Sequence, residues 1–352
     1  MTRHDRLSII IVVHNNIDLS LRCLESLSNA VLDIDHEVIL IDNASTEDTK
    51  SLAGCDRLFR RFKYRRNNDN LSFSIANNGG VGEATGSWLL FLNNDVLVGR
   101  NSVHRLLNLL KCDKSIGITG GKLLYPDRAR VQHAGIVHTL WGHPLNYGAG
   151  ADPLDERVNK RRESFAVTGA MFCTSYSLFK KLHGFDTNYI WGLEDVDLCL
   201  KTRDAGYRIV YDPSAVSIHH ESTTLKTSGN GDPGHNFSYY RKTWDRILAI
   251  REQNYLNDLM KQGIRRVAVF GTGTAARLTA SLLARSGIEI TAFTTSETET
   301  CDETFQDRPV LPLDSLEKIS FDRLIVASQF FFDLEDGIRN HDPAKKPIFP
   351  TL

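Results

Sequence analysis

Three short apolar runs end abruptly in polar residues, and this pattern limits the possible folds more than any other feature of the sequence. Ser8–Val13, Glu37–Ile41 and Trp88–Leu92 have the length of strands, and each is followed directly by His, Asp or Asn. After the first run, Asp18 opens a helical pattern with leucines three residues apart. Strands that alternate with helices predict a mainly parallel sheet with helices on its faces. Because ligands bind at the carboxyl ends of such strands, we expect a binding site where the polar segments meet.

A second α/β segment follows near the C-terminus. Val267–Phe270 is a predicted strand that leads through a Gly-Thr-Gly segment into a helical pattern, which is the context of a Rossmann-like nucleotide loop. No clear acidic ribose ligand follows the next predicted strand, so a structural or oligomerisation role is an equally good interpretation. The chain has 352 residues, which is more than a single hydrophobic core usually supports. We therefore predict a main domain at residues 1–235, a helical linker at 236–264 and a small Rossmann-like domain at 265–352.

Composition and charge exclude several broad classes of protein. The chain is 41% hydrophobic and 24% charged with a net charge of −1, whereas a whole-protein nucleic-acid binder is usually clearly basic. Its six cysteines include no CxxC pair, which argues against structural zinc and fits reduced thiols in the cytosol. The first apolar run is too short for a membrane span and lacks a cleavage site. We therefore expect a cytoplasmic protein, with the inner face of the membrane as the alternative location.

Several acidic residues and a histidine are candidates for chemistry. Asp95 closely follows a predicted strand, where its carboxylate can bind a hard divalent cation, although Asn and Asp are also common in plain turns. Glu194, Asp195 and Asp197 begin a predicted helix, where the dipole favours acids and where one carboxylate can serve as a general base. His219 opens a His-His pair. Imidazole is a common metal ligand, but such a pair is more often structural.

In their order along the chain, these segments resemble glycosyltransferase family 2, in the rhamnosyltransferase-like branch with the GT-A fold. The resemblance covers roughly residues 7–245, and the ordered combination is more specific than any single motif. Asn93 stands where many relatives carry Asp, and Ser72 replaces a common Gly. The segments that carry the resemblance are Ile9–Asn15, Asp42–Thr46, Asn70–Gly79, Leu92–Asp95, Thr168–Ala170, Glu194–Leu198 and His219.

The resemblance implies an inverting transfer of a sugar from a nucleotide-diphosphate donor, with a divalent metal as cofactor. Asp95 and His219 would hold Mn²⁺ or Mg²⁺ on the diphosphate. Asp195, with Glu194 beside it, would remove the proton of the acceptor hydroxyl as this attacks the anomeric carbon. The residues expected around the donor are His14, Asp42, Asn43, Asn77, Asn93 and Gly169.

The donor sugar and the acceptor are less constrained. The branch favours dTDP-rhamnose, with UDP-sugars next, and the acceptor would be a saccharide or a lipid-linked glycan. Six basic residues between Arg57 and Arg66 can attract an anionic acceptor or a membrane surface, although a solvated basic face is the simpler interpretation. Peripheral membrane contact and homo-oligomerisation stay open. So do two other functions: a sugar-nucleotide-binding protein without turnover, and an NAD-dependent oxidoreductase acting through the C-terminal glycine-rich loop.

Overall fold

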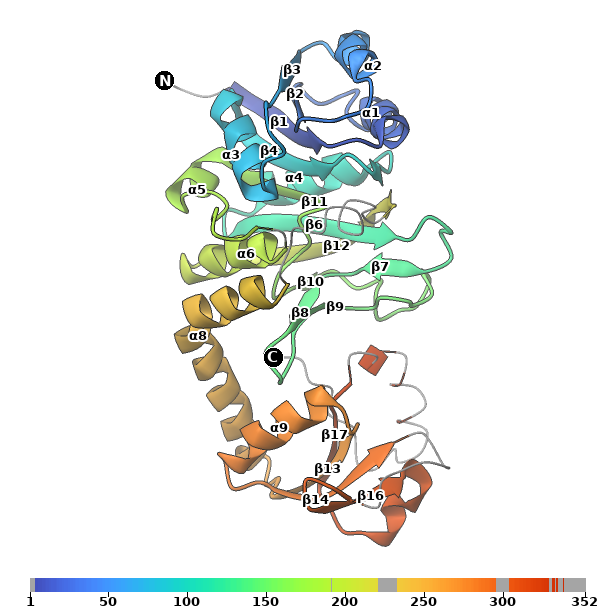
Figure 1. Cartoon of the computed structure of the whole chain (residues 1–352), viewed down its shortest axis with the longest axis vertical. Helices are drawn as coiled ribbons and strands as arrows, with labels where there is room; N and C mark the ends of the chain where they lie inside the picture. The colour runs from blue at the N-terminus through green and yellow to red at the C-terminus, as the bar shows by residue number, and fades with distance from the viewer. Residues whose placement is uncertain are drawn as a thin grey trace. The chain divides into compact units, whose positions relative to one another are not determined.

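The computed structural model describes residues 4–190, 192–220, 233–295 and 304–328, together with 331, 332, 334 and 338. Its internal contacts divide the chain into two compact units (Figure 1). The first consists of Met1–Ile136 and Asn146–Tyr240, and the second of Val137–Leu145 and Arg241–Leu352. Within the described ranges, no helix has the length and apolar character needed to cross a membrane.

A 10-stranded sheet forms the centre of the first unit. One half of it has the strand order β3-β2-β1-β4, and all three of these pairings are parallel. The strands are β1 His4–Val13, β2 His36–Asp42, β3 Phe62–Arg66 and β4 Gly86–Asn93. Val13 pairs with Asp42, and Val12 pairs with Asn93, so the carboxyl ends of β1, β2 and β4 reach the same edge. The predicted strands and their parallel arrangement are confirmed.

The other half of the sheet contains one reversed strand. β11 is antiparallel to both β4 and β6, whereas β6 and β12 are parallel. The short strands β5, β7 and β10 pair antiparallel with these longer ones. The sheet is therefore mixed but mainly parallel, as predicted. The bounds are β5 Val96–Leu97, β6 Ile116–Leu124, β7 Val131–His133, β10 Arg162–Glu163, β11 Met171–Ser175 and β12 Arg208–His219.

β12 is longer than the sequence predicts. The Asp212-Pro213 pair predicts the end of a strand, but β12 continues to His219 through a register shift between Asp212 and Val216. Proline lacks an N–H group for the ladder and is tolerated at such irregularities. The continuation places His219 on the strand itself, where it pairs with Val96 of β5.

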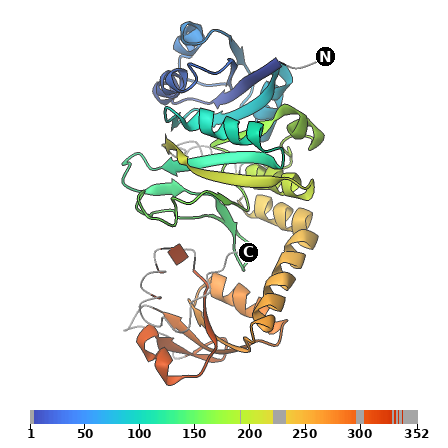
Figure 2. The same cartoon turned by 180° about the vertical axis from the view of Figure 1, so that it is seen from behind.

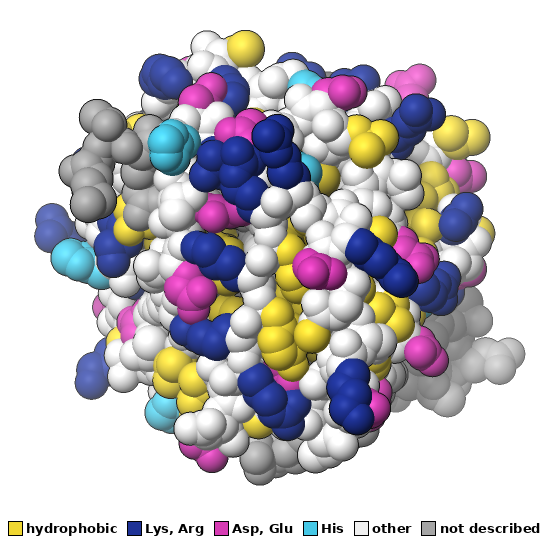
Figure 3. Space-filling model, turned by 90° about the horizontal axis from the view of Figure 1, so that it is seen from above, with side chains coloured by type: hydrophobic (Ala, Val, Ile, Leu, Met, Phe, Trp, Pro, Cys, Tyr) yellow, Lys and Arg dark blue, Asp and Glu magenta, His cyan; other side chains and the backbone are white. Residues whose placement is uncertain are grey.

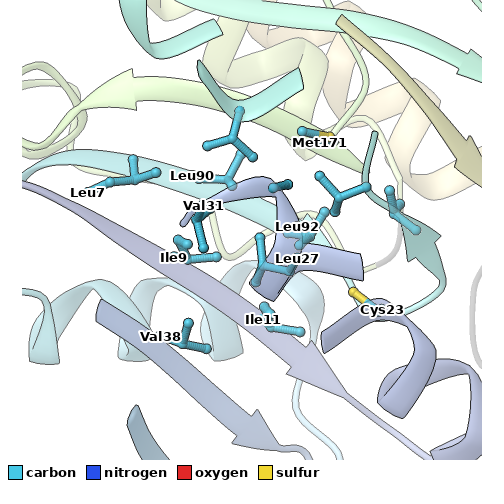
Figure 4. Close-up of a cluster of buried hydrophobic side chains, with 14 of the residues drawn as sticks. Leu7, Ile9, Ile11, Cys23, Leu27, Val31, Val38, Leu90, Leu92 and Met171 are labelled. Carbon is cyan, nitrogen blue, oxygen red and sulfur yellow. The ribbon is translucent and has the colours of Figure 1, made fainter. Parts of the chain in front are cut away.

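Helices cover both faces of the sheet. On one face, Ile9 and Ile11 of β1 belong to a buried cluster with Leu27 of α1 and Leu106 of α4 (Figure 4). α4 also packs against β6 and β12 (Figure 2). On the other face, α3 packs against β1 and β2. Side chains that alternate between two covered faces are typical of a strand buried on both sides. The bounds are α1 Ile17–Ala30, α3 Phe73–Glu83, α4 Ser102–Cys112, α5 Tyr176–Lys181 and α6 Glu194–Asp204.

The sequence Ser45–Leu52 is typical of a short helix, but the helix in this segment begins only at Lys50. Helix α2 covers Lys50–Ala53 and is followed by a 3₁₀ helix at Gly54–Leu58. The backbone N–H of Ser45 donates to the Asp42 carboxylate at 2.9 Å, and the N–H of Thr46 donates to the Asn15 side chain at 2.7 Å. These side-chain contacts hold Ser45 and Thr46 in a turn, which competes with helix formation.

The second unit contains a smaller sheet with the order β15-β16-β14-β13-β17. β13 leads through Gly271 into α9, and β14, β16 and β17 continue the parallel arrangement that the sequence predicts. The predicted helix from Asn236 is α8, Pro233–Lys261. The remaining bounds are β8 Ile136–His138, β9 Pro144–Asn146, β13 Arg266–Phe270, α9 Thr274–Ala284, β14 Glu289–Thr295, β15 Thr304–Phe305, β16 Arg308–Pro312, 3₁₀ helix η2 Leu313–Lys318 and β17 Arg323–Val326.

Candidate active site

A pocket of the first unit lies at the edge where β1 and β4 end. The structure brings most of the sequence-predicted site residues together there. The predicted residues that line it are His14, Asn43, Asn77, Asn93, Asp95, Gly169, Glu194 and Asp195. Asp42 and His219 are not lining residues, but Asp42 precedes Asn43 and His219 contacts Asp95. Phe73 and Thr168 also line the pocket.

Asp95 and His219 meet because β5 pairs with the end of β12. Val96, the residue after Asp95, pairs with His219, and the N–H of His220 donates to the Asp95 carbonyl at 3.0 Å. As a result, Oδ1 of Asp95 lies 3.2 Å from Nε2 of His219. The two side chains are only 14% and 11% exposed, respectively, so this contact is largely removed from water.

The other ring nitrogen of His219 faces Gln132 of β7. Nδ1 lies 2.7 Å from Oε1 of Gln132, and the Gln132 amide nitrogen lies 3.5 Å from the His219 carbonyl oxygen. A carbonyl oxygen only accepts hydrogen bonds, so the amide orientation puts the proton of His219 on Nδ1. In the neutral ring, Nε2 then keeps a lone pair, and this lone pair faces Asp95.

This arrangement fits a divalent cation. A lone pair of Nε2 and a carboxylate oxygen 3.2 Å apart repel each other unless a proton or cation lies between them. Nε2 of His219 is buried and makes no hydrogen bond. Imidazole and carboxylate are both suitable ligands for Mn²⁺, and Mg²⁺ often takes few protein ligands and completes its shell with water and phosphate. In the described part of the chain, no three His, Cys, Asp or Glu side chains form a metal-binding group. The Asp95–His219 pair therefore suits a cation that also binds a phosphate-bearing ligand.

Asp195 is fixed at the start of α6. The chain enters the helix through Leu193, whose backbone is left-handed with φ 72°. Oδ2 of Asp195 accepts a 2.6 Å hydrogen bond from the N–H of Gly169, and Oδ1 accepts a 2.8 Å bond from the N–H of Val196. A carboxylate has about four lone-pair sites, so these two bonds leave capacity to accept a proton in the pocket.

Glu194 lies beside Asp195 and is 7% exposed. Its Oε2 is buried without a hydrogen-bond partner. Burial raises the pKa of Glu194, and the negative charge of Asp195 raises it further. Burial also raises the pKa of Asp195, but the N–H groups of Gly169 and Val196 oppose this rise. The pair thus carries a single negative charge most readily on Asp195, which is the state that a general base needs.

Asp42 is engaged in contacts within the fold. Its fully buried carboxylate accepts hydrogen bonds from the Ser45 N–H at 2.9 Å and the Tyr64 hydroxyl at 2.8 Å, and it pairs with the Arg66 guanidinium. Burial alone would raise the pKa of Asp42, but the hydrogen bonds, first of all from Ser45, hold it below its ordinary value. The carboxylate therefore holds Ser45, Tyr64 and Arg66 in place and does not line the pocket.

Asn43 organises the loop that follows β3. Its amide donates to Asn70 and Leu71, and its side-chain oxygen accepts from Asn67 and Leu71, each at 2.8–3.1 Å. Its carbonyl accepts a 2.9 Å hydrogen bond from Nδ1 of His14. Nδ1 must carry the proton in this contact, so Nε2 is the atom that His14 can offer to a ligand.

Asn93 links the end of β4, which precedes Asp95, to the turn that contacts Asp195. Its backbone N–H donates to the Ala170 carbonyl at 2.8 Å, which connects the end of β4 to the Thr168–Ala170 turn. Asn77 lines the same pocket from α3, where its amide donates to the Phe73 carbonyl at 3.0 Å. The segment before Asp95 and the turn that holds Asp195 are thus linked directly through the backbone.

Three family models match the chain. Residues 8–168 match the model described as glycosyl transferase family 2, and residues 156–224 match the N-terminal domain of galactosyltransferase. The chain carries a glycosyltransferase family 2 domain. The resemblance expected from the ordered motifs is thereby confirmed. Residues 263–349 match a third model, described as C2185-like, N-terminal.

Two curated relatives each align with 62% of the chain. Uncharacterized protein y4gI of Sinorhizobium fredii is 32% identical over 225 residues, which are 62% of this chain and 24% of that protein. An N-acetylglucosaminyl-diphospho-decaprenol L-rhamnosyltransferase of Mycobacterium tuberculosis is 26% identical over 239 residues, which are 62% of this chain and 76% of the relative. The chain thus spans about a quarter of the length of the first relative and most of the second.

A solved structure supports the fold of the family 2 domain. The crystal structure of GalNAc-T7 with UDP, GalNAc and Mn²⁺ superposes with a TM-score of 0.53 at 16% sequence identity, covering 81% of this chain and 55% of that one. At this identity the likeness concerns the fold alone. The mixed, mainly parallel sheet and this neighbour agree with the predicted GT-A fold.

The family 2 domain also holds two buried polar residues that belong to none of the sequence motifs, Gln132 and His133. Nδ1 of His133 lies 2.7 Å from the Asn146 side-chain oxygen, and its Nε2 accepts a long 3.5 Å bond from the Thr168 N–H. Burial lowers the pKa of His133 to about 4, so the ring is neutral at pH 7. The available sequence signal was a Gln-His pair between Val131 and Ala134.

The basic run of the family 2 domain is largely paired with acids. Figure 3 looks onto the end of the domain where α2 and β3 lie, and Lys and Arg side chains are interspersed there with Asp and Glu. The pairs are Arg61 with Asp35, Lys63 with Glu37, Arg65 with Glu83, and Arg66 with Asp42. These pairs favour the solvated-face interpretation, and membrane contact stays a prediction.

Proposed function

We propose that the chain is an inverting, metal-dependent glycosyltransferase that moves a sugar from a nucleotide-diphosphate donor to a saccharide or lipid-linked glycan. One observation carries the proposal. A single pocket is lined by Asp95, which contacts His219, and by Asp195. A site for the leaving diphosphate and a general base therefore share one cavity, which is what a single displacement requires.

The roles follow from the contacts of each side chain. A bound Mn²⁺ or Mg²⁺ would neutralise the charge that develops on the leaving diphosphate. Asp95 and His219 would supply an oxygen and a nitrogen ligand to this cation. Asp195 takes the proton of the acceptor hydroxyl, whose oxygen attacks the anomeric carbon opposite the leaving group, so the configuration inverts. Glu194 stays protonated and leaves the charge on Asp195.

We assign the donor to the part of the pocket lined by His14, Asn43, Asn77 and Asn93. Asp42 acts there indirectly, through Ser45 and Arg66. A dTDP-linked rhamnose is the first donor to test, because the Mycobacterium tuberculosis relative is named as a rhamnosyltransferase. A UDP-sugar is the second, because the GalNAc-T7 structure contains UDP and Mn²⁺.

We propose for the whole chain the domain limits predicted from the sequence, namely 1–235, 236–264 and 265–352. The last of these would be a Rossmann-like accessory domain. Placement in the cytoplasm or at the inner face of the membrane, and homo-oligomerisation, stay predictions.

A thermal-shift screen tests the proposed function. UDP, dTDP and their sugars are added to the full chain with and without Mn²⁺, and the melting temperature is measured. Ligand at about 100 times its Kd should stabilise the native state by roughly 2.7 kcal/mol. We expect a shift that needs Mn²⁺, that is lost in Asp95→Ala, and that survives in Asp195→Asn, although this last variant should transfer sugar far more slowly than wild type. Full transfer in excess EDTA would contradict the metal role.

A further inference from the structure

Gln132 of strand β7 contacts both the ring and the backbone of His219 through its side-chain amide. It is 4% exposed, and it is a neutral amide in a strand whose other members are Val131 and His133. Burying an amide without hydrogen-bond partners costs free energy, so the contacts that the Gln132 amide makes offset the cost of its burial. Both of those contacts go to His219.

The orientation of the amide decides which nitrogen of His219 carries the proton. The amide NH₂ faces the His219 carbonyl at 3.5 Å, and this leaves Oε1 facing Nδ1 at 2.7 Å. Reversing the amide would place its oxygen against the His219 carbonyl oxygen, and two acceptors cannot form a hydrogen bond. The amide thus favours the tautomer with hydrogen on Nδ1.

The opposite tautomer would compete with metal binding. With hydrogen on Nε2, His219 would donate to Oδ1 of Asp95, which is 3.2 Å away. That hydrogen bond would use the same two atoms that the proposed function assigns to a divalent cation. A preference for hydrogen on Nδ1 therefore keeps the lone pair of Nε2 available for a metal ion.

We propose that Gln132 is a positioning residue, which holds His219 in the tautomer whose Nε2 can bind the divalent cation of the donor complex. The inference rests on the proposed metal use but adds a residue and a physical task to it. Gln132 itself contacts neither the cation nor the substrate. Partners of metal-binding histidines commonly act in this way, and their loss typically weakens metal binding by about 10–100-fold.

The test compares three substitutions in the full chain. Gln132→Met keeps the length of the side chain and removes the acceptor. Gln132→Glu keeps an oxygen acceptor for Nδ1 and should rescue the function. Thr174→Val is the matched control, because it removes a buried 2.8 Å hydrogen bond to the Gly117 carbonyl in the same sheet without contacting His219.

The first readout needs neither metal nor activity. ¹⁵N NMR of histidine-labelled protein reports the tautomer of His219, whose signals are assigned by their loss in His219→Gln. We expect hydrogen on Nδ1 in the wild type, in Gln132→Glu and in Thr174→Val, and a shift towards hydrogen on Nε2 in Gln132→Met. An unchanged tautomer in Gln132→Met overturns the proposal.

The second readout is Mn²⁺ binding in the presence of UDP or dTDP, followed by electron paramagnetic resonance. We expect binding about 10–100-fold weaker in Gln132→Met and within a few-fold of wild type in the other two variants. Equal affinity in Gln132→Met and wild type overturns the role of Gln132 alone. Absence of Mn²⁺ binding in the wild type overturns the metal part of the proposed function, and the task of Gln132 with it. The two failures are thus distinguishable.

Discussion

The carboxylate of Asp195 accepts a 2.6 Å hydrogen bond from the backbone N–H of Gly169. This contact joins the first turn of α6 to the Thr168–Ala170 turn, which also lines the pocket. A hydrogen bond donated to a carboxylate favours its charged form. The contact therefore both places Asp195 and helps to keep it ionised beside the more buried Glu194.

The two adjacent carboxyl groups should respond differently to amide substitution. Asp195→Asn should lower the transfer rate by about 10²–10⁴-fold, because a general base contributes a factor of this size. Glu194→Gln should stay within roughly tenfold of wild type at neutral pH, because glutamine resembles the protonated glutamic acid in size and charge. Initial rates with saturating donor check both variants. Equal losses in the two would contradict the assignment of the charge to Asp195.

Glu194 should also make the stability of the chain depend on pH. Its pKa is raised from 4.5 to about 8 in the folded chain, so the unfolded chain releases this proton at lower pH than the folded chain does. The unfolded state is therefore favoured progressively as the pH rises through this window. Glu194→Gln lacks this effect. Its melting temperature should match wild type near pH 4 and exceed it increasingly towards pH 8, as measured by calorimetry. A difference that is independent of pH would argue against the raised pKa.

Much of the sheet could be predicted because its signals are local. An apolar run that stops at a polar residue identifies the end of a strand, and the ends of β1, β2 and β4 were found in this way. Helix α3 carries no such signal, because it contains three glycines, which have poor helix propensity. Its formation depends on the Ser72 cap, which accepts from the Ile75 N–H, and on packing against β1 and β2.

The site was predictable in its residue types and less so in its contacts. The motif that contains Asp42 points to the donor site, but two of the groups that occupy its carboxylate, Tyr64 and Arg66, are distant in sequence. Gln132 was missed for the same reason, since 87 positions separate it from His219. Contacts of this kind arise from strand pairing and leave no periodic pattern in the sequence.

Asp42 should stabilise the fold as well as the pocket edge. Asp42→Asn removes the charge that pairs with Arg66 and weakens the bonds to Ser45 and Tyr64, so we expect a loss of about 1–3 kcal/mol in the free energy of unfolding. Because the native pKa of Asp42 is lowered, the loss should be complete above the ordinary value of 3.8 and shrink as the pH falls below it. Urea unfolding at several pH values measures this. The exposed Asp69→Asn is the control and should change stability by less than about 0.5 kcal/mol.

Two neighbouring glycines of α3 should give opposite results when replaced by alanine. A Cβ atom on Gly80 would lie 2.7 Å from both Cγ2 of Ile10 and Cδ1 of Ile41, so Gly80→Ala overpacks the face between α3 and the sheet. We expect this to cost about 1–3 kcal/mol. A Cβ on Gly82 would meet no atom within 4 Å, and alanine is the better helix former, so Gly82→Ala should gain about 0.5–1 kcal/mol. Urea midpoints at an unchanged m-value measure both. If Gly80→Ala were also stabilising, α3 could not pack on β1 and β2 as closely as described, and the position of Asn77 in the pocket would be in question.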